Sequence, residues 1–126
     1  MKIEKWYDDE LQSISIDTWW MMTHFMIEQE NIQSWENGLS ILWDFIENPM
    51  DYYIWMDDWW EVYDSDTCDI DITFNLWYQD NQRTIQVSMI WVEIRLYFDK
   101  KDILYFAWVL KDCIENMKKS LFSKIW

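Results

Sequence analysis

Residues 69–77 read Asp-Ile-Asp-Ile-Thr-Phe-Asn-Leu-Trp, and this stretch decides the fold that we expect for the chain. Its apolar side chains Ile70, Ile72, Phe74 and Leu76 stand at every second position, and the positions between them are mostly polar. A period of two is typical of a β-strand that buries one face and leaves the other in solvent. The sequence therefore predicts a sheet with one apolar face turned towards a core.

The segments on either side of this strand extend the sheet. Residues 52–63 alternate with the same period, and a turn at residues 64–67 separates them from the strand. After a second turn at residues 79–82, apolar residues alternate again over residues 84–97, with a change of phase near residues 89–90. The phase change predicts one long strand that is either bulged or buried on both faces at that point. Because short turns join consecutive strands antiparallel, these segments predict a β-meander.

Two segments before the sheet have helical spacing. Asp17 is a candidate N-cap, and apolar residues at helical intervals over residues 20–28 predict a first helix. Residues 32–46 predict a second helix that ends before Pro49, since proline disfavours helical geometry in the residue before it. Gly38 lies inside the second segment and leaves open a break into two shorter helices.

The two ends of the chain complete the expected fold. Residues 2–7 and 11–16 are either two short strands or one strand followed by a turn. Asp99 is an expected N-cap for a last helix, whose apolar stripe runs over residues 103–121. We expect an α+β fold: an antiparallel β-meander packed on one face by helices, with a long C-terminal helix, in a single acidic, Trp-rich domain of residues 1–126.

Charge is distributed unevenly along the chain. The formal net charge is −14, and the stretch from Trp6 to Gln82 contains no Lys or Arg but 18 of the 24 acidic residues. From Arg83 onward, eight Lys and Arg accompany five acidic residues. Solubility alone would explain the negative total but not the absence of cations over so long a stretch. We interpret the negative field as a means of steering a positively charged partner.

The same composition excludes several functions. Binding the phosphate backbone of nucleic acid, or an anionic membrane surface, needs a cationic face that most of this chain lacks. No apolar run approaches the roughly 18 residues of a membrane span, and the first ten residues are polar and charged, unlike a cleavable signal. Two cysteines form neither a disulfide framework nor a zinc pattern. We therefore expect a cytoplasmic protein.

Aromatic residues suggest a binding surface. The chain has 12 Trp, and several of them should be partly exposed, because a buried indole N–H needs an acceptor and exposed Trp often carries binding energy. If helices cover the apolar face of the sheet, its other face alternates aromatic rings with carboxylates. The candidate partner-binding residues are Tyr53, Trp55, Asp57, Asp58, Trp59, Glu61, Tyr63, Asp64, Asp66, Asp69, Asp71 and Trp77. The alternative is a sheet buried on both faces.

The acidic turn between the first two strands is a weak candidate for a metal site. Asp64, Asp66, Asp69 and Asp71 gather oxygen ligands, but an EF-hand loop counted from Asp64 needs Gly at its sixth position and Glu at its twelfth. Those positions are Asp69 and Asn75, so we interpret the segment as a solvated turn. We expect no metal and no cofactor.

Groups for catalysis are equally scarce. His24 is the only histidine, and we expect it on the first helix as a packed or surface residue. A single glycine, Gly38, cannot build a phosphate-binding loop. Carboxylates are so numerous that no acid–base pair stands out, so we expect a protein that is not an enzyme.

In size, acidity and lack of catalytic groups the chain resembles bacterial immunity proteins, which neutralise a cognate toxin, and phage-encoded inhibitors that mimic nucleic acid. The resemblance is one of composition and covers no alignable motif. It implies an inhibitor that binds a basic protein, such as a nuclease toxin or a defence nuclease, through the acidic-aromatic face. A small-ligand module that stacks a sugar or an organic cation on its aromatic rings is the alternative. The same face would also serve as a homodimer interface.

Overall fold

The computed structural model describes residues 1–7, 12–18, 21–28, 31–52, 59–64, 70–79, 81–89 and 92–125. Its strands form two antiparallel sheets, each with its strands in sequence order. The first sheet contains β1 (Lys2–Tyr7), β2 (Gln12–Thr18) and β3 (Met21–Ile27). The second contains β4 (Trp59–Asp64), β5 (Ile70–Gln79), β6 (Gln82–Met89) and β7 (Val92–Phe98). The predicted meander is thus confirmed as the second sheet, and β1–β3 form a separate sheet before it.

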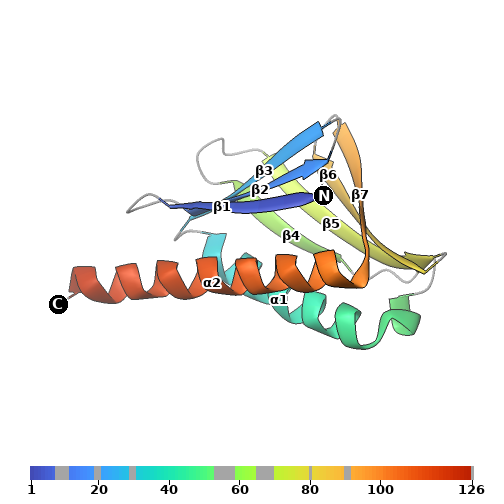
Figure 1. Cartoon of the computed structure of the whole chain (residues 1–126). Coiled ribbons are helices and arrows are strands. Elements are labelled where there is room, and N and C mark those ends of the chain that lie inside the picture. Colours follow the sequence, from blue (N-terminus) through green and yellow to red (C-terminus); the bar gives the residue numbers. More distant parts are fainter. Residues whose placement is uncertain are drawn as a thin grey trace.

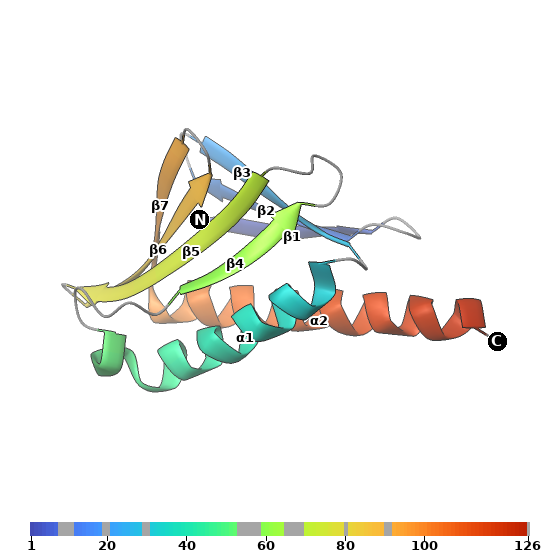
Figure 2. The ribbon, with the colours of Figure 1, turned by 180° about the vertical axis from the view of Figure 1, so that it is seen from behind.

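Both long helices lie on the same side of the sheets (Figures 1 and 2). These are α1 (Ile32–Glu47), which a short 3-10 helix η2 (Pro49–Tyr52) follows, and α2 (Lys100–Ile125). The two helices run antiparallel: the Lys118 ammonium of α2 pairs with the Glu36 carboxylate near the start of α1, and Trp108 contacts Trp43. The α+β class and the long C-terminal helix are therefore as predicted.

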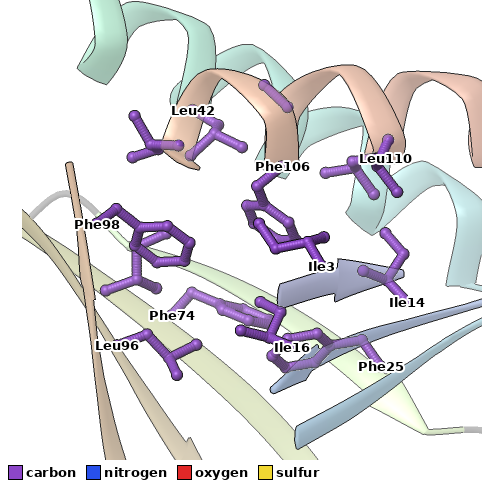
Figure 3. Packing of buried hydrophobic residues seen from close by; sticks show 14 of the residues in the cluster. Ile3, Ile14, Ile16, Phe25, Leu42, Phe74, Leu96, Phe98, Phe106 and Leu110 are labelled. Carbon is purple, nitrogen blue, oxygen red and sulfur yellow. The ribbon is translucent and has the colours of Figure 1, made fainter. Parts of the chain in front are cut away.

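One hydrophobic cluster joins both sheets to both helices. Figure 3 shows it as side chains of α1 and α2 facing side chains of the strands. Phe25 on β3 lies at its centre, since its ring centroid is 5.9 Å from Trp35 of α1, 5.5 Å from Phe74 of β5 and 6.4 Å from Phe106 of α2. Each fully buried side chain of this size contributes about 1.5–3 kcal/mol, so this junction holds the four units together.

The helix predicted for residues 20–28 is wrong, because the described part of that segment is strand β3. Asp17 is not an N-cap; it lies in β2 and pairs with Met22 of β3. Thr23, Phe25 and Ile27 are buried at every second position. The alternation is hidden in the sequence because Met and His occupy exposed positions where a strand usually has clearly polar residues.

The single strand predicted for residues 84–97 is also wrong. It is divided between β6 and β7, which pair antiparallel with Met89 opposite Val92. The change of phase near residues 89–90 therefore comes from a chain reversal and not from a bulge. Of the strand pattern predicted from residue 52, Tyr52 belongs to η2 and residues 59–63 lie in β4, while residues 53–58 lie outside the described residues.

Several local predictions are confirmed. Residues 2–7 and much of residues 11–16 form the two strands β1 and β2. Gly38 does not break α1; it is buried inside one continuous helix. The Asp99 carboxylate accepts a 2.7 Å hydrogen bond from the backbone N–H of Asp102, so it caps α2 as expected. The predicted turn between β5 and β6 contains Asn81 at a φ of 62°, a left-handed conformation that asparagine tolerates.

Candidate protein-binding surface

The structure describes the side chain of one of the twelve predicted partner-binding residues. Outside the described residues lie Tyr53, Trp55, Asp57, Asp58, Asp66 and Asp69. The backbone is described for Trp59, Glu61, Tyr63 and Asp64 in β4, and for Asp71 in β5. Trp77 in β5 is the one member of the set whose side chain is described.

The strand register shows which of these positions share a phase of the sheet. In the β4–β5 ladder, Trp59 pairs with Asn75, Glu61 with Thr73, Tyr63 with Asp71 and Asp64 with Ile70. Paired residues of an antiparallel ladder share a phase, so Trp59, Glu61 and Tyr63 stand on the phase of Trp77. Asp64 stands on the other phase. The register is thus compatible with the predicted face for three positions of β4 and for Asp71.

The described side chains of the second sheet separate into two faces. Phe74, Leu76, Ile85, Val87 and Leu96 are buried on the face that packs in the core shared with the helices and the first sheet. The opposite face, which we call the outer β5–β7 face, consists of Thr73, Asn75, Trp77, Thr84, Gln86, Ser88, Glu93, Arg95 and Tyr97. All of these except Thr84 are half-buried or exposed, so this part of the sheet is covered on one side only. The expected alternative of a sheet buried on both faces does not hold here.

One cross-strand row on the outer β5–β7 face is aromatic. Thr84 on β6 pairs with Trp77 on β5 and with Tyr97 on β7. Thr84 is only 2% exposed although it lies on the outer phase, because the larger rings flank it, while Tyr97 is 52% exposed. Two rings about two strand spacings apart, with a small side chain between them, form a shallow aromatic platform.

Arg95 completes this platform. Its guanidinium carbon lies 5.5 Å from the centroid of the Trp77 ring. Its Nε donates a 3.2 Å hydrogen bond to Oε1 of Gln86, whose Nε2 donates a 3.4 Å hydrogen bond to Oγ of Ser88. The outer β5–β7 face therefore carries an oriented cation beside its aromatic row. Sequence reasoning missed Arg95 and Tyr97 because it treated residues 84–97 as one strand.

The expectation that several Trp are partly exposed is confirmed for the described side chains. Trp6 is 60% exposed and Trp108 is 50% exposed, while Trp43 and Trp77 are half-buried. Trp35 is fully buried, and its indole N–H has no hydrogen-bond partner among the described residues. The ring centroids of Trp108 and Trp43 are 5.6 Å apart, and the Lys111 ammonium lies 4.8 Å from the centroid of the Trp108 ring. Helices α1 and α2 therefore carry a second aromatic group at the surface.

The described groups offer little for catalysis. His24 lies exposed on β3 and not on a helix. Cys113 is buried on the core side of α2, and this burial raises the pKa of its thiol to about 11, which suppresses the nucleophilic thiolate. Within the described ranges, no group of three or more His, Cys, Asp or Glu is placed to hold a metal ion.

None of the helices that the structure describes, α2 included, is long and apolar enough to cross a membrane. Comparison of the chain with protein-family models, with curated proteins and with solved structures found no match in any of the three.

Proposed function

We propose that this protein is a binding inhibitor of the immunity-protein type, which docks the outer β5–β7 face on a basic partner such as a nuclease toxin and blocks it. The observation that carries the proposal is the uncovered outer face of the second sheet, with Trp77 and Tyr97 in one row. Aromatic rings that are partly desolvated and rigidly placed are the side chains that most often anchor protein interfaces.

The distribution of charge supports a basic partner. Six of the ten Lys and Arg lie on α2, which packs on the core side of the sheets, away from the outer β5–β7 face. Much of the negative charge belongs to the stretch between Trp6 and Gln82. Such an asymmetric field accelerates the encounter with a cationic surface and weakens as salt rises. The same reasoning fits a phage-type inhibitor that presents its carboxylates in place of nucleic acid phosphates.

A small-ligand module is the second candidate. The amide of Gln86 lies between Arg95 and Ser88 in the middle of the outer β5–β7 face, close to the aromatic row. Aromatic rings beside amide and guanidinium groups suit a sugar as well as a protein. A ligand of this kind would bind with little dependence on salt, whereas capture of a basic protein would weaken strongly when salt is raised.

The test is capture of a basic partner by the immobilised protein from a lysate of its source organism, followed by affinity measurements with two variants. Trp77→Ala removes the β5 ring of the aromatic row on the outer β5–β7 face, and Trp108→Ala removes an exposed ring from α2 as a matched control. Loss of an interface anchor costs about 2 kcal/mol or more, so Trp77→Ala should weaken binding roughly 30-fold, and Trp108→Ala should leave it unchanged.

The inhibitor proposal also requires that one equivalent of the protein abolish the activity of the captured partner, nucleolytic or otherwise. If no basic protein is retained even at low salt, electrostatic capture is wrong. If both Trp variants weaken binding equally, the partner docks elsewhere. Salt-independent binding of small sugars that Trp77→Ala removes would favour the small-ligand module instead.

A further inference from the structure

Arg95 is held in a defined orientation on the outer β5–β7 face by groups other than a carboxylate. Its backbone lies on β7 and its guanidinium lies over the ring of Trp77 on β5, so the side chain crosses β6. The Nε–H is bound by Gln86, and Gln86 is itself bound to Ser88. The Trp77 ring therefore sets how far the guanidinium lies above the sheet, and the Gln86 amide sets how its plane is turned.

This arrangement is unusual in so acidic a chain, which has 24 acidic residues for ten Lys and Arg. In the part of the chain that the structure describes, every ion pair is formed by a lysine. The pairs are Lys2 with Glu4, Lys5 with Asp112, Lys111 with Glu115 and Lys118 with Glu36. Arg95 forms none of them, although Glu93 stands two residues away on the same phase of β7.

The other arginine, Arg83, has a structural role inside the protein. Arg83 is buried, lies 5.6 Å from the Tyr78 ring, and donates from Nη2 to the carbonyl oxygen of Ile46 at 3.3 Å, near the end of α1. It thereby ties the second sheet to that helix. Arg95 is exposed, and its two terminal nitrogens have no hydrogen-bond partner among the described residues. Its terminal donors are therefore accessible to solvent and to a ligand.

We propose that Arg95 is a carboxylate anchor, whose two terminal nitrogens bind one Asp or Glu side chain of the docking partner. The end of a guanidinium presents two parallel N–H groups that match the two oxygens of a carboxylate. Trp77 and Gln86 hold the side chain in place before binding, so little rotamer freedom remains to be lost. That the carboxylate belongs to a protein rests on the proposed function; the preference of Arg95 for a carboxylate does not.

A single cation in this position determines specificity. A uniformly acidic surface would attract any polycation, whereas Arg95 penalises a partner that places Lys or Arg against Trp77 and favours one that places a carboxylate there. The net negative charge of the whole chain would then set the rate of encounter, and Arg95 would set the register of the complex.

The test is an NMR titration of the protein labelled with 15N-arginine, which contains only two arginines and therefore gives two side-chain Nε–Hε signals. Arg95→Lys removes one signal and so assigns both. Sodium acetate is the probe, and sodium chloride at the same ionic strength is the control. We expect the Arg95 signal to shift saturably with acetate, with a dissociation constant on the order of 100 mM, while the Arg83 signal stays in place as an internal reference.

Gln86→Ala should weaken acetate binding about threefold or more, because it removes the hydrogen bond that orients the guanidinium. The proposal is overturned if acetate shifts the Arg95 signal no more than chloride does, or if it shifts the signals of Arg83 and Arg95 alike. The titration uses no partner, so it can succeed when no basic protein is captured and fail when one is. Its outcome is therefore separate from that of the proposed function.

Discussion

Cys113 should react with thiol reagents about a hundredfold more slowly in the folded protein than an exposed cysteine, even before steric protection is counted. The side chain is fully buried on the core side of α2. Burial is the main cause that raises its pKa to about 11 from an ordinary value of 9.0, with the smaller effect of Lys5 acting in the opposite direction. This rise of the pKa by about two units lowers the thiolate fraction near pH 8 about a hundredfold, and the thiolate is the form that reacts.

The measurement is the rate of reaction with a disulfide reagent near pH 8 in a Cys68→Ser variant, where Cys113 is the single thiol. The same variant unfolded in concentrated guanidinium chloride supplies the reference rate. Subdenaturing denaturant should accelerate the reaction of the folded protein, since the reagent reaches Cys113 only when α2 separates from the sheets. A folded rate within tenfold of the unfolded rate would refute both the burial of Cys113 and the docking of this part of α2.

Two further predictions concern the fold. Trp35→Phe should change the free energy of unfolding by less than about 1 kcal/mol. The substitution loses packing, but it also removes a buried indole N–H that has no partner among the described residues, and leaving such a donor unpaired costs about 1–3 kcal/mol. Phe74→Ala in the same cluster should lower the free energy of unfolding by about 3–5 kcal/mol. Denaturant unfolding compares the two, and a loss above about 2 kcal/mol for Trp35→Phe would contradict the reasoning. The hydrogen bond from the Tyr52 hydroxyl to the Asp44 carboxylate is the main cause that lowers the pKa of Asp44, so it stabilises the fold above about pH 4 and is lost as the pH falls through the lowered pKa. Tyr52→Phe should flatten the acid dependence of stability below about pH 4, and equal pH profiles for both proteins would contradict this.

Helices and strands were predictable wherever the apolar residues of a segment followed a single period, either two or 3.6. The strand around Phe74 alternates strictly, and α2 has both its N-cap at Asp99 and a continuous apolar stripe, so both were predicted correctly. Strand β3 was not predictable in the same way, because exposed Met22 and Met26 give its two faces the same apolar character. Its helix-like pattern was overridden by pairing with β2, which depends on the tertiary arrangement.

The candidate surface was predicted only in outline. Trp77 was identified because it stands on the polar phase of a regular strand. Arg95 was not, since its contact with Trp77 crosses β6 and joins positions that are 18 residues apart. No periodicity along the chain indicates such a contact; it exists only once β5, β6 and β7 have paired in register.

The sequence by itself determined the α+β class, the antiparallel succession of the strands β4, β5 and β6, the two long helices and the strongly asymmetric charge, because these follow from periodicity and composition within short segments. Only the tertiary structure decided that the strands divide into two sheets, that Phe25 joins both sheets to both helices, and that Arg95 lies over Trp77. The physical reason is the range of the interactions. Hydrogen-bonded turns and capped helices are local, whereas sheet partition and ring packing depend on contacts between segments far apart in the chain.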